Sequence, residues 1–358
     1  MAKIDSNKAA AKRLTIILFF LSGLLFLAIF FILGFVYTNL FGVPEWKSSE
    51  EIAEKKSLVK IDTNFVQLWT APAEWRIMKL EPEEQKLVKY GQELISHTSE
   101  YLGPKGNVTQ ISNGMNCQNC HLNAGTQPWG NNYFAVQANY PKFRERSGAV
   151  ENQVKRVNDC FERSLNGKAL DSTSREMKAI LAYIKWVGSD VPKKTTPRGA
   201  GIFKVKGLKR ANNPEKGRLV YEQKCQSCHQ ANGEGILAEN GKSYTYPPLW
   251  GKNSYNQGAG LYRISNFAGY VRYNMPLGAT YERPQLTDEE AWDLAAFVNS
   301  QPRPTKDLSK DWPNIAGKPF DHPFGPYADP FSEQQHKYGP YKPIKEWKEA
   351  HKKPANSK

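Results

Sequence analysis

The pentapeptide Cys-x-x-Cys-His occurs twice in this chain, at 117–121 and at 225–229. In this pattern two cysteine sulfurs can form thioethers to the vinyl groups of a haem, and the adjacent histidine can bind its iron. One copy alone would also suit a redox disulfide or a zinc site. Two copies, each followed by a further sulfur-containing side chain, favour covalent attachment of two haems c. The attaching residues would be Cys117, Cys120 and His121 in the first copy and Cys225, Cys228 and His229 in the second.

The second haem has a candidate for its other iron ligand in Met275, which Pro276 follows directly. A methionine before a proline indicates a turn, where a side chain can reach an iron, rather than a helix core. Pro247 matches a cytochrome c feature in which a prolyl carbonyl accepts a hydrogen bond from the ligating histidine and fixes its ring. We therefore expect His229 and Met275 to hold the second iron.

The first haem has Cys160, the fifth cysteine, at the corresponding place. A buried free thiol is the other interpretation, but an unpaired cysteine in an oxidising compartment is open to oxidation. Met115 stands too close to Cys117 to reach the opposite face of the haem, and Met177 suits a helix core. His97 would give a bis-histidine haem and stays an alternative. We expect Cys160 to bind the iron together with the histidine of the first motif.

A thiolate ligand lowers the reduction potential of a haem and places a nucleophilic sulfur beside it, which points to catalysis on a sulfur compound. Basic residues crowd the same stretch, the arginines nearest to Cys160 being Arg146, Arg156 and Arg163. If 154–165 is helical, Arg156 lies one turn before Cys160 and Ser164 one turn after it. Because guanidinium groups match planar oxyanions, this register predicts an anion site at the thiolate.

Helical patterns flank both motifs and would position them. In the first half, apolar residues recur at helical spacing after Pro82 and again over 174–187. In the second half, a helix starts at Asn213-Pro214 and runs into Cys225, and another covers 288–299.

The second of these patterns has a recognisable start and a permissive crossing point. Thr287 and Glu290 form a capping box before the helix over 288–299, and Gly217 would let the two helices approach closely. This layout resembles a class I cytochrome c domain, in which the N-terminal and C-terminal helices cross beside the haem, with Trp292 and Phe297 packed around the crossing. The expected fold is mainly α, with two such domains in tandem after a single N-terminal transmembrane helix.

The expected domains follow from these patterns. They are a cytoplasmic N-terminus at 1–13, a transmembrane anchor at 14–36, a tether at 37–75, a first cytochrome c domain with the catalytic haem at 76–190, a linker at 191–212, a second cytochrome c domain with the electron-transfer haem at 213–302, and a tail at 303–358. The tail shows no regular pattern, but its many aromatic residues indicate a segment wrapped over the two domains.

The segment 14–36 carries no charged residue and as a helix would span roughly 35 Å, enough to cross a bilayer. The basic residues that precede it, Lys3, Lys8, Lys12 and Arg13, predict a cytoplasmic N-terminus. A cleaved signal peptide is the alternative, yet no small-residue cleavage site follows the apolar stretch. We expect a single-pass protein of the cell inner membrane with its haem domains in the periplasm.

The chain of 358 residues has 49 Lys and Arg against 35 Asp and Glu, a formal charge of +14. This balance favours anionic partners. Haem attachment of this type takes place outside the cytoplasm, so we expect no nucleic acid among them.

The chain resembles a known family over most of 76–345: the dihaem cytochrome c thiosulfate dehydrogenases, which form tetrathionate and some of which run in reverse as tetrathionate reductases. The stretches that carry the resemblance are Cys-His-Leu-Asn-Ala-Gly at 120–125, Tyr-Pro-Lys-Phe-Arg-Glu-Arg at 140–146, Arg-Val-Asn-Asp-Cys-Phe-Glu-Arg-Ser-Leu-Asn-Gly at 156–167, Pro-Pro-Leu-Trp-Gly at 247–251, Asn-Gln-Gly-Ala-Gly at 256–260, Asn-Met-Pro-Leu-Gly at 274–278 and Gln-His-Lys-Tyr-Gly-Pro at 335–340.

The resemblance implies that the first haem, held by His121 and Cys160, is the active site. Arg146, Arg156 and Ser164 match substrate-binding positions, thiosulfate and tetrathionate are the implied substrates, and the second haem would relay electrons to a small cytochrome c or a membrane redox complex. The chain departs from parts of the family in two ways. It has no lysine over 253–274 that could replace Met275 as a ligand, and secreted members lack the apolar span.

Other functions also suit a chain with two haems. One is a membrane-tethered electron shuttle without catalysis, which the arginines around Cys160 disfavour. A dihaem peroxidase would need a displaceable ligand on one iron. A sulfur-oxidation cytochrome would conjugate thiosulfate to a carrier protein instead of to a second thiosulfate.

Overall fold

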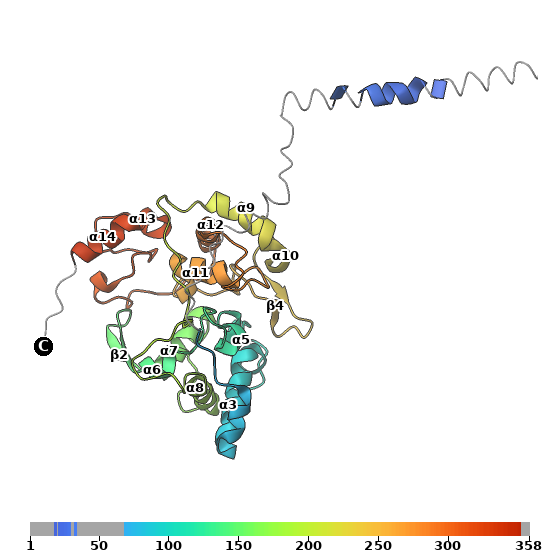
Figure 1. Ribbon diagram of the computed structural model, residues 1–358. Coiled ribbons are helices and arrows are strands. Elements are labelled where there is room, and N and C mark those ends of the chain that lie inside the picture. Colours follow the sequence, from blue (N-terminus) through green and yellow to red (C-terminus); the bar gives the residue numbers. More distant parts are fainter. Residues whose placement is uncertain (1–17, 20, 30–31, 34–67, 352–358) are drawn as a thin grey trace, which may run out of the picture. The chain divides into compact units, whose positions relative to one another are not determined.

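The computed structural model describes residues 18–19, 21–29, 32–33 and 68–351, and helices dominate this part of the chain (Figure 1). This confirms the mainly α fold. The strands form two short antiparallel hairpins. In the first, β1 (Lys142–Arg144) pairs with β2 (Ala149–Glu151), with Phe143 opposite Val150. In the second, β3 (Ile236–Leu237) pairs with β4 (Tyr244–Tyr246).

In the first domain, α3 (Pro82–Ser96) packs across α8 (Arg175–Val187). A Cβ at Gly91 of α3 would lie 2.0 Å from the carbonyl oxygen of Ala179, so only glycine allows this approach. The side chain of Ser174 caps α8 by accepting a hydrogen bond from the amide of Met177 at 3.1 Å. The two helices bury an apolar face that borders the first haem motif.

The second domain repeats this crossing with α9 (Pro214–Lys224) and α12 (Asp288–Ser300). A Cβ at Gly217 would lie 1.9 Å from the carbonyl oxygen of Asp293, which confirms the predicted role of this glycine. Trp292 is buried, and the ring of Phe297 lies 5.7 Å from that of Trp250. The crossing therefore has the predicted aromatic packing around it.

The capping box of α12 is present as predicted. The amide of Glu290 donates to Thr287 Oγ1 at 3.1 Å, and the amide of Thr287 donates to Glu290 Oε2 at 2.8 Å. We expect Thr287→Ala to lower the free energy of unfolding by about 1 kcal/mol, because one helix N-terminal amide loses its partner. Thermal unfolding of the holoprotein measures this, with Thr305→Ala, an exposed tail threonine, as the control. Equal stability of the two variants would contradict the prediction.

Shorter elements complete the two domains and the tail. In the first domain they are η1 (Glu74–Lys79), α4 (Thr98–Leu102), η2 (Cys117–Asn119), α5 (Leu122–Gly125), α6 (Val136–Asn139), α7 (Gln153–Asp159) and η3 (Cys160–Ser164). In the second they are α10 (Gln226–His229), η4 (Gly260–Tyr262) and α11 (Ile264–Asn274), and in the tail η5 (Ile315–Gly317), α13 (Glu333–Tyr338) and α14 (Lys342–Ala350).

The predicted helix over 154–165 is in fact α7 followed by one π-helical turn, η3. The amide of Leu165 bonds the carbonyl of Cys160 at 2.9 Å, five residues back, which widens the turn. Because α and π turns accept the same residue types, the periodicity does not distinguish them. Such turns occur often at functional sites, and this one begins at Cys160.

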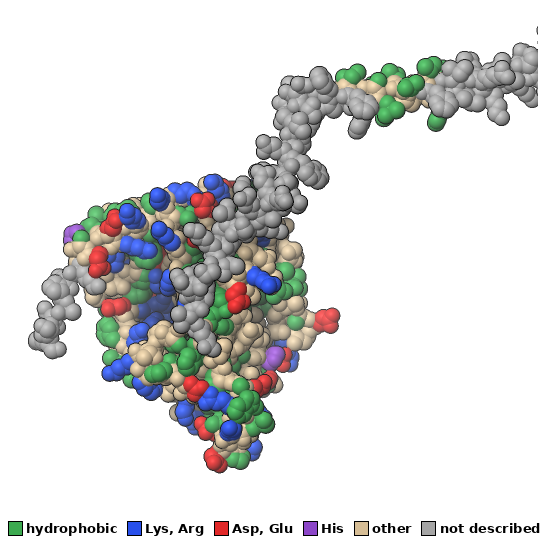
Figure 2. Space-filling model, in the orientation of Figure 1, with side chains coloured by type: hydrophobic (Ala, Val, Ile, Leu, Met, Phe, Trp, Pro, Cys, Tyr) green, Lys and Arg blue, Asp and Glu red, His purple; other side chains and the backbone are tan. Residues whose placement is uncertain are grey.

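The tail contains two helices that the sequence pattern did not indicate, α13 and α14, because both are short. Tyr341 and Ile344 are buried, and the Tyr341 ring lies 5.5 Å from that of Trp292 in the second domain. Asp321 bonds Arg263 Nη2 at 2.6 Å, which fixes the tail to the start of α11. In Figure 2, Lys and Arg side chains gather over the tail and beside a hollow next to it.

The described residues between 18 and 33 are helical, and their large apolar side chains are exposed. Residues 14–17, 20, 30–31 and 34–36 of the predicted span, and the tether up to residue 67, lie outside the described residues. Within the part of the chain that the structure does describe, none of the helices has both the length and the apolar character needed to cross a membrane.

Candidate haem and anion site

The first haem motif opens with η2, whose N-terminus is held by two asparagines: the amide of Asn116 donates to Asn119 Oδ1 at 2.7 Å. The amide of Cys117 donates to Thr98 Oγ1 at 2.9 Å. These bonds orient the motif so that Cys117, Cys120 and His121 line one cavity. Burial raises the pKa of each of the two thiols to about 12, which suits sulfurs that a thioether would keep uncharged.

His121 is fixed in the orientation that an iron ligand needs. Its Nδ1 is hydrogen-bonded to the carbonyl oxygen of Asn131, and its ring stacks on Tyr133 with 4.6 Å between centroids. Burial lowers the pKa of His121 to about 4, so the imidazole is neutral and its Nε2 can act as a donor to iron. A carbonyl partner on the far nitrogen is the usual arrangement for a ligating histidine.

The second motif lies on α10 and has the predicted partner. His229 Nδ1 lies 2.8 Å from the carbonyl oxygen of Pro247, which confirms that expectation. Met275 is the residue that ends α11, in extended conformation, and it lines a cavity of about 510 Å³ together with Cys225, Cys228 and His229. This volume lies within the range of protein cofactor sites, about 300–1,000 Å³.

The donor sets of both cavities fit a haem c. Each cavity offers two thiols, an oriented imidazole and a further sulfur, with apolar walls. A zinc site would need several donors converging on one point, but no group of three or more His, Cys, Asp or Glu side chains does so among the described residues. We therefore read both motifs as haem attachment sites, with the ligand assignments standing as predictions.

Cys160 lies in the first cavity together with Arg156, Ser164 and the residues of the first motif. The structure thus brings together the predicted thiolate, one predicted cation and the predicted hydroxyl. Arg156 forms no ion pair with any described residue, and the nearby Cys160 is the main influence that raises the pKa of its guanidinium. This arginine is available to an anion.

The alternative ligands of the first iron lie elsewhere. His97 is exposed, with its Nε2 4.0 Å from a carboxylate oxygen of Glu93. Met177, on α8, is buried in the hydrophobic core, as expected, and Met115 lines the second cavity. Of the four candidate ligands for the first iron, Cys160 is the one that lines the first cavity.

Arg146 and Arg163 line an adjoining cavity that shares Cys160, Arg156 and Ser164 with the first. Arg163 is engaged in a bidentate ion pair, with both terminal nitrogens 2.8 Å from the oxygens of Asp311. Arg146 donates from Nη1 to the carbonyl oxygen of Gly258 at 2.7 Å. Burial, followed by the charge of Arg163, lowers the pKa of Arg146 to about 10, which leaves it cationic at neutral pH.

Sequence reasoning missed three groups that shape this site. Asn131 provides the carbonyl for His121, and Asp311 and Trp312 of the tail lie against the arginines. Asp311 is 148 positions from Arg163, and nothing in its local sequence signals the pairing. The carbonyl of Gly258, which binds Arg146, belongs to the stretch 256–260 that carries part of the family resemblance. That resemblance is a signal that could have indicated a role for Gly258.

The two haem cavities adjoin. Cys120 lines both, and Asn119 of the first motif also lines the second cavity. The hydroxyl of Tyr270, on α11, donates to the carbonyl oxygen of Asn119 at 3.0 Å. The helix that leads to Met275 is therefore tied to the first motif, and the two attachment sites are close enough to share walls.

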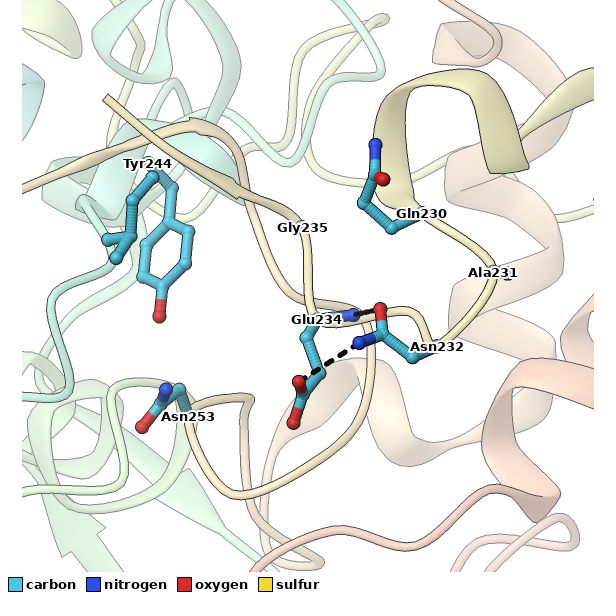
Figure 3. Close-up of a pocket in the computed structure, with 8 residues that line it drawn as sticks. Gln230, Ala231, Asn232, Glu234, Gly235, Tyr244 and Asn253 are labelled. Carbon is cyan, nitrogen blue, oxygen red and sulfur yellow. Dashed lines mark hydrogen bonds between the residues drawn. The ribbon is translucent and has the colours of Figure 1, made fainter. Parts of the chain in front are cut away.

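A further cleft, of about 540 Å³, lies beside the second motif (Figure 3). Asn232 and Glu234 bond each other there, with Asn232 Nδ2 3.1 Å from Glu234 Oε2, while Tyr244 and Asn253 lie across the opening. Glu234 is the charged residue among the described residues that line it, and its charge would repel anions. This cleft does not suit the anion chemistry indicated at Cys160.

Comparisons with known proteins agree with this geometry. Residues 214–302 match the cytochrome c family, and residues 107–192 match the cytochrome c domain of the SoxA/TsdA family. Two cytochrome c domains are therefore confirmed, and haem c binding with them.

Proteins named thiosulfate dehydrogenase are similar to more than half of this chain. Thiosulfate dehydrogenase of Psychrobacter arcticus is 37% identical over 232 residues, 63% of this chain and 67% of that protein. Thiosulfate dehydrogenase of Allochromatium vinosum is 38% identical over 198 residues, 54% of this chain and 72% of that protein. The structure of a thiosulfate dehydrogenase from Marichromatium purpuratum superposes with a TM-score of 0.61 at 29% identity, covering 67% of this chain and 50% of that one.

Proposed function

The chain belongs to the thiosulfate dehydrogenase family, and we propose that it interconverts two thiosulfate ions and one tetrathionate ion at the first haem. The observation that carries the proposal is the joint presence of Cys160 and Arg156, which has no ion pair with a described residue, in the cavity of the first haem motif. An electron shuttle without catalysis has no use for a free guanidinium beside a cysteine at its haem.

The residues divide into holders of cofactor and binders of substrate. His121 and Cys160 would hold the first iron, and His229 and Met275 the second. When bound, each haem supplies a one-electron redox centre, so the pair can take up the two electrons that leave when two thiosulfates join. The shared wall between the cavities supports transfer from one haem to the other.

Arg156 and Arg146 offset the repulsion between dianions that must meet in a partly desolvated cavity. Ser164 adds a hydroxyl that can donate a hydrogen bond to a thiosulfate oxygen. The Cys160 thiolate is the nucleophilic group in the same cavity. These side chains bind and orient the anions with the outer sulfur toward Cys160.

The covalent route is a two-step reaction at Cys160. In the first step a bond forms between Cys160 Sγ and the outer sulfur of thiosulfate, and two electrons leave. The product is Cys–S–S–SO₃⁻. In the second step the outer sulfur of another thiosulfate attacks that sulfane sulfur, the bond to Cys160 breaks, and tetrathionate leaves with the thiolate restored. Reversing both steps gives tetrathionate reduction.

Anchoring in the cell inner membrane belongs to this proposal as well. Its support is the uncharged stretch 14–36, the basic residues before it, and the exposed apolar side chains of the described helical residues 18–33. With the N-terminus in the cytoplasm, the haem domains would face the periplasm and exchange electrons with a small cytochrome c or a membrane redox complex.

Catalytic voltammetry of the purified dihaem protein tests the proposed reaction. We expect an oxidative current on adding thiosulfate, a reductive current on adding tetrathionate, and tetrathionate as the product of thiosulfate oxidation with no carrier protein present. Electron paramagnetic resonance of the oxidised first haem should show a low-spin thiolate signature. Absence of both currents, or only bis-histidine or histidine–methionine signals, would reject the proposal.

A further inference from the structure

The tail residues Asp311 and Trp312 lie against Arg146 at the edge of the cavity that contains Cys160. The amide of Trp312 donates to the carbonyl oxygen of Arg146 at 2.7 Å, and the guanidinium lies 5.6 Å from the centre of the Trp312 ring. Trp312 is nine-tenths buried and lines the same cavity as Arg156 and Cys160. An aromatic face at this distance attracts the cation and limits its orientations.

Asp311 links the two neighbouring arginines. Its oxygens each lie 2.8 Å from a terminal nitrogen of Arg163, and Oδ2 lies 3.9 Å from Arg146 Nε. The exposed fractions of the Asp311 and Arg163 side chains are 9% and 11%, so this pair is shielded from solvent. Because Asp311 binds both terminal nitrogens of Arg163, and Asp159 lies 3.8 Å from Arg163 Nε, Arg146 is the less neutralised of the two cations.

The Arg146 guanidinium makes a hydrogen bond, an ion pair and a ring contact with described residues. All three partners lie outside the first domain. The hydrogen bond goes to Gly258 of the second domain, and the other two contacts go to the tail. A Cβ at Gly258 would lie 2.6 Å from Arg163 Nη1, so a larger residue there would displace the paired guanidinium of Arg163. Arg146 itself follows the exposed strand β1, which does not constrain its side chain.

We propose that Asp311 and Trp312 are positioning residues that hold Arg146 in reach of the anion and thereby set the affinity for thiosulfate. The inference rests on the proposed function. A free arginine samples many rotamers, and ordering it upon binding costs free energy that a fixed arginine has already lost on folding. The tail contains no haem motif, but it would then form part of the substrate site.

The test compares Trp312→Ala and Asp311→Asn with wild type as full-length dihaem proteins, using steady-state oxidation of thiosulfate. We expect KM for thiosulfate to rise about tenfold in each variant, with kcat within about threefold, because the fixation of one cation is lost while Cys160 is untouched. Trp312→Phe, which keeps an aromatic face, should restore most of the affinity. Titration of the first-haem absorption with thiosulfate gives the same comparison without turnover.

Matched controls exist in the same tail. Trp347 of α14 stacks on His351, and the carboxylate of Asp307 accepts a hydrogen bond from the amide of Ser309. Both residues lie outside the cavity. Trp347→Ala and Asp307→Asn should therefore leave KM unchanged. Haem content per chain verifies folding. If Trp312→Ala fails to retain haem, Asp311→Asn decides the question.

Three results would overturn the inference: an unchanged KM in Trp312→Ala and Asp311→Asn, a lower KM in Asp311→Asn, or an equal rise in Trp347→Ala. A lower KM would mean that Asp311 acts only by repelling the substrate. Lack of thiosulfate oxidation by wild type is a different outcome, since it rejects the proposed function itself.

Discussion

Replacing Cys160 with glycine should leave both haems attached and reduce turnover by at least about a thousandfold, because the reacting sulfur is removed. Haem attachment depends on the cysteines of the two motifs, and Cys160 belongs to neither. The cavity would also keep Arg156 and Ser164, so thiosulfate should still perturb the first-haem spectrum. Haem content is measured by pyridine haemochrome, and turnover is measured as thiosulfate oxidation and as tetrathionate reduction.

Cys160→Met separates two roles of the sulfur. A thioether can bind iron but cannot form the Cys–S–S–SO₃⁻ adduct, because it has no free thiolate. If Cys160 serves as nucleophile, the methionine variant should regain a six-coordinate low-spin spectrum and stay inactive. Near-normal turnover in either variant would show that the Cys160 sulfur does not take part in the reaction as a nucleophile.

The second domain could be predicted from sequence in detail because its signals are local. Pro214 and Asn213 mark the start of α9, Thr287 and Glu290 mark the start of α12, and a glycine in an otherwise helical stretch marks the crossing. The Pro247 carbonyl that holds His229 lies within the same domain. Such signals depend on few residues and little on the remainder of the fold.

The first cavity could be predicted only in part. The register of Arg156, Cys160 and Ser164 is set by one helical segment, and all three line the cavity as expected. The π turn at Cys160 could not be read from residues that suit an α-helix equally well. Asp311 reaches the site through a long-range contact that depends on how the tail folds over both domains.

The second domain also contributes to the first cavity in a way that sequence spacing does not reveal. Tyr255, Leu261 and Arg263 line the cavity shared with Cys160, although they follow the second haem motif in the chain. Arg263 is paired with Asp321, so it adds a cation that is already neutralised. The cavity that contains Cys160 is thus assembled from both domains and the tail, and acidic residues of the tail pair with several of its arginines.

Arg156 is the cation for which we expect the largest loss of substrate affinity and rate. Arg156→Gln should lower kcat/KM for thiosulfate by about a hundredfold to a thousandfold, as for the loss of one preorganised donor to developing charge. It lies in the first cavity with Cys160, and no ion pair joins it to a described residue; Asp159 and Glu151 influence its guanidinium less than Cys160 does.

The variant Arg156→Lys tests whether charge or geometry is needed. A lysine keeps the charge but lacks the planar fork that binds two oxygens of a sulfonate at once, so we expect an intermediate loss. Arg175→Gln is the matched control, because that arginine is exposed at the start of α8, where it lies 5.0 Å from the ring of Tyr90. Stopped-flow reduction of the first haem by thiosulfate measures all three variants. If Arg156→Gln and Arg175→Gln reduce at equal rates, the anion site does not include Arg156, and the charge that gathers the two dianions must come from Arg146.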